Sequence, residues 1–165
     1  HFKSKEELWR ASADRVFGGL KQALDEAAAA PAEGTRKARM AAMIRAYVRY
    51  AAEQPALHRF LVVESARPSP RLDWLVHRYL RPFITTSVAD MRELQKSGVA
   101  TRGNPALLVN MMRILAGGLP ALGHEIKRSS NFDLHATANM NALVDLIVGI
   151  FLPGEAREED PGTPT

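Results

Sequence analysis

The chain of 165 residues contains no cysteine, which excludes a disulfide framework and any metal site built on thiolates. It has no apolar run that reaches the roughly 18 residues of a membrane-spanning helix, and no signal peptide is visible. A Gly-rich phosphate loop and a His-Glu-x-x-His zinc motif are also absent. These absences predict a cytoplasmic protein that has no membrane partner.

Residues suited to catalysis or metal binding are few and scattered. The five histidines are widely spaced and have no second histidine or carboxylate at a convincing ligand interval: His1, His58, His77, His124 and His135. His124 and Glu125 are adjacent, so on a helix their side chains would diverge by about 100°. We therefore expect no metal, no cofactor and no enzymatic activity. A helical enzyme would need a base and a nucleophile that converge in a pocket, and no such pair is evident.

The composition is that of an ordinary globular domain, with 46% apolar and 24% charged residues. The net charge of +4 is uneven, because the segment 155–160 carries a net −3 and residues 1–152 carry +7. That excess is compatible with solvated arginines on helix faces or with long-range attraction of DNA. The arginines are not grouped with aromatic residues as in a nucleic-acid groove, so charge alone does not predict DNA binding.

Apolar residues recur at three- and four-residue spacing throughout the chain, and no strand pattern is present. This periodicity predicts an all-α fold of about six helices. Loop and breaker residues place the expected helices at 4–30, 35–54, 55–64, 72–98, 104–120 and 133–151.

Several helix starts can be assigned from short polar residues that accept backbone N–H groups. Ser4 and Glu7 have the spacing of a capping box, in which Ser4 accepts the Glu7 N–H and the Glu7 carboxylate reaches back to the Ser4 N–H. We also expect caps at Thr35, Asn104 and Asp133.

Two helices have unusual features. Pro82 lies inside the longest expected helix, and it predicts a kink between Arg78 and Pro82 because proline lacks a backbone donor. The last helix is apolar nearly all round, which indicates burial on more than one side. One face can cover its own core while the other meets a partner chain.

The first eight residues, His-Phe-Lys-Ser-Lys-Glu-Glu-Leu, resemble the segment that closes the DNA-binding head in the tetracycline-repressor (TetR) family of bacterial transcriptional regulators. In that family a recognition helix ends in an aromatic-x-His-Phe run, and a short turn leads into the long helix that joins the head to the body. The connection from Gly98 to Pro105 also resembles the family's Gly followed by Asp-Pro, with Asn104 in place of the Asp.

The resemblance implies a division of the chain. Residues 1–3 would end a helix-turn-helix head whose remainder is missing, and residues 4–152 would form a ligand-binding and dimerisation domain. The polar, proline-containing residues 153–165 predict a disordered acidic tail.

The resemblance also implies operator DNA as a partner. The family's Lys at the position of Lys5 contacts a DNA phosphate, and His1 falls at the end of the recognition helix. Phosphate contacts position a protein on the duplex without reading its sequence. The plainer interpretation is that Lys5 is an exposed lysine of a first helical turn.

A small-molecule site in such a body needs an apolar cavity with a few polar groups. The resemblance places the cavity among helices that carry these candidate residues: Met40, Met43, Tyr47, Phe60, Trp74, His77, Arg78, Arg81, Asn110 and Arg113. Each has a plainer role. Tyr47 and the methionines suit a core, His77 suits a solvated position, Trp74 suits a partly exposed one, and Glu64 can pair with an arginine of the next helix.

The resemblance further implies a homodimer held by a four-helix bundle of the last two helices of each chain. The expected interface residues are Leu108, Met112, Leu115, Leu119, Leu143, Ile147, Ile150 and Phe151. Small residues at Gly117 and Gly118 would permit close approach between the subunits.

Together these features predict a TetR-like DNA-binding repressor that a small, largely apolar ligand releases from its operator. The alternative is a stand-alone helical carrier of hydrophobic small molecules that does not bind DNA. The carrier would have the same cavity but no DNA-binding head.

Overall fold

The computed structural model describes residues 1–30 and 34–155, and this part of the chain is helical without any strand. The elements are α1 (Lys5–Ala29), α2 (Arg36–Glu53), α3 (Pro55–Glu64), α4 (Pro70–Leu75), the π-helical turn η1 (Val76–Leu80), α5 (Arg81–Lys96), α6 (Pro105–Ala121), α7 (Gly123–Ser130) and α8 (Thr137–Phe151). With α4, η1 and α5 counted as one continuous rod, the described residues form seven helices. The all-α prediction is confirmed, and α7 is the helix that periodicity missed.

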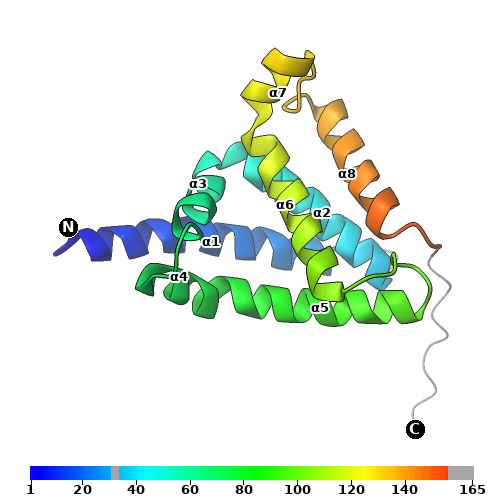
Figure 1. Ribbon diagram of the computed structural model, residues 1–165, viewed down its shortest axis with the longest axis horizontal. Coiled ribbons are helices and arrows are strands. Elements are labelled where there is room, and N and C mark those ends of the chain that lie inside the picture. The colour runs from blue at the N-terminus through cyan, green and yellow to red at the C-terminus, as the bar shows by residue number, and fades with distance from the viewer. Residues whose placement is uncertain (31–33, 156–165) are drawn as a thin grey trace, which may run out of the picture.

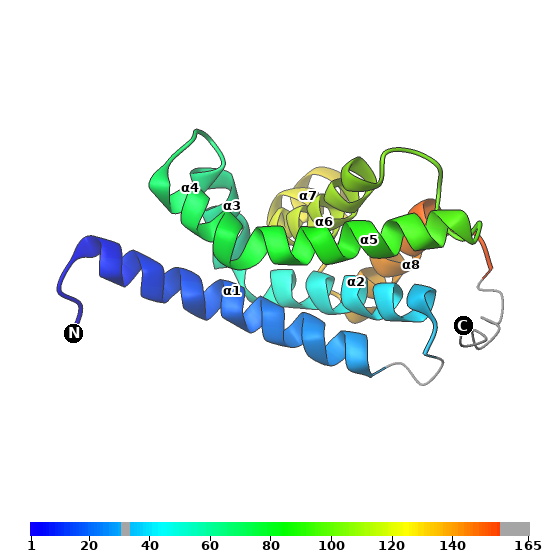
Figure 2. The ribbon, with the colours of Figure 1, turned by 90° about the horizontal axis from the view of Figure 1, so that it is seen from below.

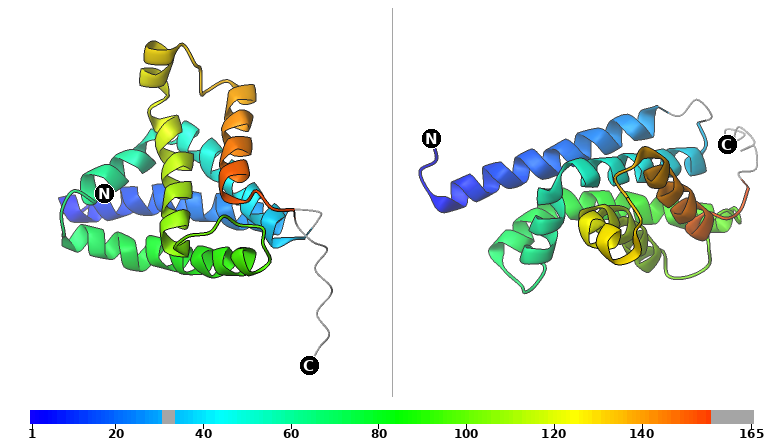
Figure 3. Two further views of the ribbon diagram at one scale, coloured as in Figure 1. Left: turned by 45° about the vertical axis from the view of Figure 1, so that its right-hand side comes forward. Right: turned by 90° about the horizontal axis from the view of Figure 1, so that it is seen from above.

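The helices are arranged in three layers. α1 forms one side, α2 lies in the middle, and α6 and α8 lie on the side remote from α1, as Figures 2 and 3 show. The rod of α4 and α5 runs beside α1, and α7 stands at the far end from both (Figure 1). α2 contacts α1, α6 and α8, so it is the central helix of the core. The largest fully buried side chains come from almost every layer: Val48, Leu57, Leu75, Met91, Val144, Ile147, Phe151 and Leu152.

The start of α1 is capped almost as the sequence indicates. Ser4 Oγ accepts the Glu7 N–H at 3.0 Å. The Glu7 carboxylate, however, accepts from the Lys3 N–H and not from Ser4. The second hydrogen bond of the capping box is therefore shifted by one residue. The extended Ser4 backbone brings the Lys3 N–H, in place of the Ser4 N–H, to the Glu7 carboxylate.

Two further caps are present where they were expected, and one is not. Thr35 caps α2, and Asn104 Oδ1 accepts two backbone N–H groups at the start of α6. Asp133 does not cap α8. Its carboxylate accepts the His135 N–H within a turn, and α8 begins later, at Thr137, without a side-chain cap.

The interruption expected near Pro82 takes the form of a π-helical turn. The Arg81 N–H reaches back five residues to the Val76 carbonyl, in place of the four-residue step of an α-helix. Pro82 follows directly, as the second residue of α5, so the backbone hydrogen bond that proline cannot donate falls beside the π-helical turn.

The chain after α8 returns to the α5–α6 connection. The Gly154 N–H donates to the Val99 carbonyl at 2.9 Å, and Lys37 Nζ donates to the Gly154 carbonyl at 2.7 Å. Gly154 is therefore held by α2 and by the connection, although the sequence placed it in the tail. Residues 156–165 of that predicted tail lie outside the described residues.

No single helix of the described chain is both long enough and apolar enough to cross a membrane. α6 and α7 meet that length and hydropathy only when taken together, and they are bent by 73° relative to each other.

Candidate functional site

A cavity of about 260 Å³ opens between α1, α2, the η1–α5 segment and α6. Its wall is mainly apolar, with polar groups from each helix: Phe17, Leu20, Lys21, Leu24, Asp25, Met43, Tyr47, Arg78, Tyr79, Leu80, Pro82, Phe83, Thr86, Ser87 and Arg113. The volume lies just below the range for ligand sites in proteins, which begins near 300 Å³.

A second cavity of about 50 Å³ adjoins the first. The two share part of their lining: Leu24, Met43, Tyr47, Phe83, Ser87 and Arg113. Met40 lines the smaller cavity only. The shared wall is therefore where a molecule in the larger cavity would come next to the smaller one.

Three polar groups belong to this shared wall. The side chains of Tyr47 and Ser87 are almost fully buried, at 6% and 8% exposure. Burial raises the pKa of the Tyr47 hydroxyl, and the neighbouring Arg113 guanidinium partly opposes that shift. Arg113 is half-buried, and its Nε donates to Asn110 Oδ1 at 2.8 Å. A hydrogen-bonding group thus lies inside a mostly apolar cavity.

At the other end of the cavity, η1 is tied to α1. Arg78 Nε donates to Asp14 Oδ1 at 2.7 Å, and the Tyr79 hydroxyl donates to the same oxygen. Burial raises the pKa of Asp14, but the hydrogen bonds from Tyr79 and Arg78 outweigh it and hold that pKa below its ordinary value. Arg78 and Tyr79 therefore belong both to the cavity wall and to the attachment of α1.

Aromatic side chains form a cluster beside the cavity, where α1 meets α3 and α4, and its rings contact Phe17 and Tyr79 of the cavity wall. The Trp9 ring makes edge-on contacts with Phe60 and Trp74, at centroid distances of 5.8 and 5.6 Å. Trp9 Nε1 also donates to Glu64 Oε1 at 3.1 Å, so Glu64 bonds to a tryptophan in place of the expected arginine. Phe60 and Trp74 support α1 and do not line the cavity.

The structure brings some of the predicted ligand-binding residues together and separates others. Met43, Tyr47, Arg78 and Arg113 line the larger cavity, and Met40 lines the smaller one. The remaining five lie elsewhere, with His77 and Arg81 exposed, Asn110 orienting Arg113, and Phe60 and Trp74 in the aromatic cluster.

The most important residue that the sequence analysis missed is Ser87. It lies four residues from both Phe83 and Met91, inside the apolar stripe of α5. A polar residue in the middle of an apolar stripe could have indicated a polar site, because a buried hydroxyl usually has a hydrogen-bond partner.

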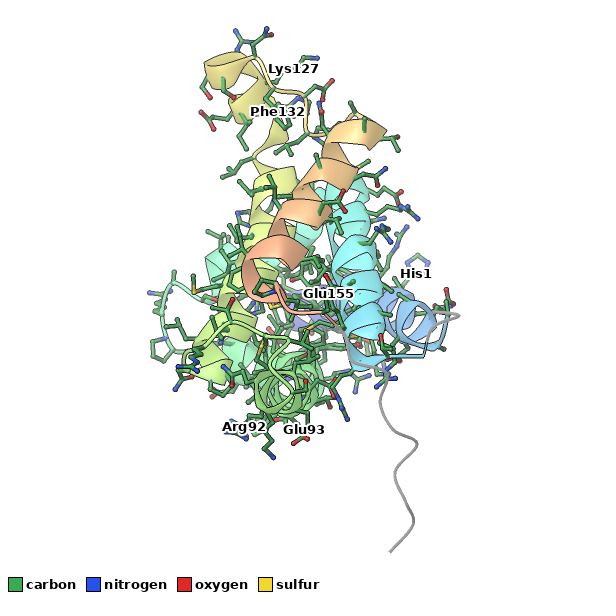
Figure 4. All side chains as sticks on the ribbon, turned by 90° about the vertical axis from the view of Figure 1, so that its right-hand side faces the viewer. His1, Arg92, Glu93, Lys127, Phe132 and Glu155 are labelled. Carbon is green, nitrogen blue, oxygen red and sulfur yellow. The ribbon has the colours of Figure 1, made fainter. Side chains whose placement is uncertain are left out.

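The two residues predicted to contact DNA lie at the free end of α1. His1 and Lys5 are both exposed and line neither cavity. Figure 2 shows this N-terminal end of α1, and Figure 4 labels His1. α7 and the turn after it occupy another extremity of the molecule, which Lys127 and Phe132 mark in Figure 4.

The residues predicted for the dimer interface differ in their exposure. Five of them are buried in the core of the subunit: Leu108, Met112, Leu143, Ile147 and Phe151. Leu115 and Leu119 are partly buried against the same core, and only Ile150 is exposed, at 56%. The exposed apolar side chains of these helices are their neighbours: Leu107, Met111, Ile114 and Leu122 near α6, and Leu146 with Ile150 on α8.

The role expected for the two glycines of α6 is also different. Gly117 is buried, and an added Cβ would lie 2.7 Å from Cε1 of Tyr47. Gly118 faces His58. Gly117 therefore permits close packing within the subunit, whereas a Cβ at Gly118 would make only an ordinary contact.

Within the described residues, no group of three or more His, Asp or Glu side chains could hold a metal ion. No family model and no curated protein matches the chain.

Proposed function

We propose that this chain is the ligand-binding and dimerisation body of a TetR-like transcriptional regulator, a cytoplasmic repressor that releases its operator when a small, largely apolar ligand binds. The observation that carries the proposal is a pair of hydrogen bonds from the cavity wall to α1, in which Arg78 and Tyr79 both donate to Asp14. α1 begins at the segment that resembles the joint to a DNA-binding head.

A mechanism follows from that attachment. A ligand that shifts Tyr79 or Arg78 weakens the hold of η1 on Asp14, and α1 then changes its angle to the rest of the body. The ligand can do so only through a higher affinity for the shifted state. A tenfold loss of operator affinity requires about 1.4 kcal/mol of coupling. One exposed ion pair supplies less than that, so the packing of Tyr79 against Phe17 must change as well.

The unpartnered apolar face of α6 and α8 supports the homodimer. Leu107, Met111 and Ile114 are exposed on α6, and Leu146 and Ile150 are exposed on α8. Contiguous apolar surface of this kind marks interaction sites in proteins. In the dimer, this face of each subunit would form the four-helix bundle.

The dimer would present two heads to successive major grooves, about 34 Å apart. The exposed His1 and Lys5 lie at the end of α1 from which each head would extend. In this arrangement Lys5 contacts a phosphate and the helix before His1 reads the bases.

The decisive experiment is a gel shift with the protein expressed from the coding sequence that includes the region upstream of His1. We expect a shift on its own upstream DNA at low salt. Asp14→Asn should alter the response to ligand without abolishing the shift, because Asp14 is remote from the DNA. If no helix-turn-helix is encoded upstream and no shift occurs, the regulator proposal fails.

A helical carrier of hydrophobic small molecules is the second candidate, and the cavity itself favours it. A carrier does not need the cavity to be coupled to α1. Equal ligand affinity in the wild type and in Asp14→Asn, together with no DNA binding, would favour the carrier.

A further inference from the structure

We infer that the cavity takes a small apolar carboxylic acid, whose carboxylate lies against Arg113, Tyr47 and Ser87. The inference rests on the ligand site of the proposed function and gives that site a chemical class. It follows from the charges on the cavity wall, from the donors of two buried groups and one half-buried group, and from the volume.

The charged groups at the mouth of the cavity are paired. Lys21 Nζ lies 2.5 Å from Asp25 Oδ2, and Arg78 Nε lies 2.7 Å from Asp14 Oδ1. Each pair is neutral overall, so these residues carry no net positive charge that would attract an anion to the mouth.

The shared wall is different. Asp90, which lines the smaller cavity, is paired with Arg36 at 3.3 Å. Arg113 has no ion pair with an acid anywhere in residues 1–30 and 34–155, and its Nε is held by the neutral amide of Asn110. One positive charge is therefore left uncompensated on the wall of a mostly apolar cavity. A cation in such a place is costly unless an anion pairs with it.

Three donor groups line the same wall. The Nη groups of Arg113 can approach a carboxylate in the paired geometry that guanidinium and carboxylate prefer. The Tyr47 hydroxyl lies beside that guanidinium. The Ser87 hydroxyl makes no hydrogen bond to another residue in the described part of the chain, although its side chain is only 8% exposed. A carboxylate has two oxygens with about four acceptor sites, which suits this set.

The volume limits the rest of the ligand. Liquid water takes about 30 Å³ per molecule, so 260 Å³ corresponds to about nine waters. One aromatic ring with a short acid chain fills that space. Phe17, Leu20 and Phe83 supply apolar contacts for the ring.

The test compares matched acids and amides by isothermal titration calorimetry at pH 7.5. The probes are benzoate, phenylacetate and cinnamate, each with its neutral amide of nearly the same shape. Carboxylic acids of this type are ionised at that pH. We expect at least one acid to bind at least tenfold more tightly than its amide, a difference of about 1.4 kcal/mol.

Variants connect the preference to the residues. Arg113→Gln should remove the preference for the acid over the amide, and Ser87→Ala should reduce that preference. Arg92→Gln is the matched control, because it makes the same change at an exposed residue of α5 outside the cavity and should leave the preference intact. Melting curves establish that each variant is folded, and Ser87→Ala provides the test if Arg113→Gln does not fold.

The outcomes separate the inference from the proposed function. Equal binding of acid and amide, or an acid preference that survives Arg113→Gln, overturns the inference while a ligand site remains. Failure of all six probes to bind also overturns it, and the gel shift of the longer protein still decides the regulator proposal independently.

Discussion

The ring of Tyr47 lies against the bare α-carbon of Gly117, so that α2 and α6 approach closely at the cavity wall. A methyl group at position 117 would lie 2.7 Å from Cε1 of that ring, which is closer than real carbon atoms tolerate. At Gly118 the nearest side-chain atom, Cε1 of His58, would lie at an ordinary 3.7 Å. Two adjacent glycines of one helix therefore have different roles.

We expect Gly117→Ala to lower the free energy of unfolding by about 1–3 kcal/mol, because it overpacks the wall and displaces Tyr47. Gly118→Ala is the matched control and should be neutral or stabilising by up to about 1 kcal/mol, since alanine favours the helix. Urea titrations followed by circular dichroism measure both. Equal stability of the two variants would mean that the packing of the Tyr47 ring does not require a glycine at position 117.

The bonds to Asp14 predict a dependence of stability on pH. Because Tyr79 and Arg78 lower its folded pKa below the unfolded value of about 3.9, Asp14 stabilises the fold above that value. The stabilisation is lost as the pH falls through the folded pKa. Melting temperatures between pH 6 and pH 3 should fall less steeply in Asp14→Asn than in the wild type. An unchanged slope would remove Asp14 from the acid response.

The exposed face of α6 and α8 predicts which substitutions separate subunits. Leu146→Glu should give a folded monomer by light scattering, because Leu146 is 65% exposed on that face. Ile147→Glu should unfold the chain instead, since Ile147 is only 1% exposed within the subunit. Val63→Glu introduces the same charge on α3 and should leave a dimer intact. A dimer that survives Leu146→Glu would place the contact on another surface.

The cap of α6 gives a stability prediction that is independent of function. Asn104 Oδ1 accepts the Ala106 and Leu107 N–H groups, so Asn104→Ala should cost about 1 kcal/mol. Asn104→Gly should cost only a few tenths of that amount, because glycine is tolerated at this position. A similar loss in both variants in thermal unfolding would mean that the side-chain bonds are not the cause.

The features that the sequence predicted well depend on local chemistry. Ser4, Thr35 and Asn104 cap helices through backbone groups within three residues, so their roles do not depend on the rest of the fold. α7 was missed because it has eight residues with only Ile126 as a large apolar side chain, which is too little for a periodic pattern.

The side of α8 that faces the core could not be determined in the same way. The helix is apolar nearly all round, so its periodicity does not distinguish Ile147 from Leu146. Only the positions of α2 and α6 determine the buried face. The residues that line the cavity could not be predicted together for a similar reason. Tyr47, Ser87 and Arg113 come from three helices, and no spacing in the sequence relates them.

The π-helical turn between α4 and α5 also sets how the two ends of that rod are rotated about their common axis. A π turn corresponds to one residue more than an α-helix of the same path, and one residue of α-helix turns the chain by about 100°. If the same residues kept α-helical hydrogen bonds throughout, α4 would be rotated relative to α5 by about that angle. Trp74 would then turn away from Trp9, while Phe83 and Ser87 kept their places at the cavity. The five-residue step in η1 is thus what allows this sequence to face the aromatic cluster at one end of the rod and the cavity at the other.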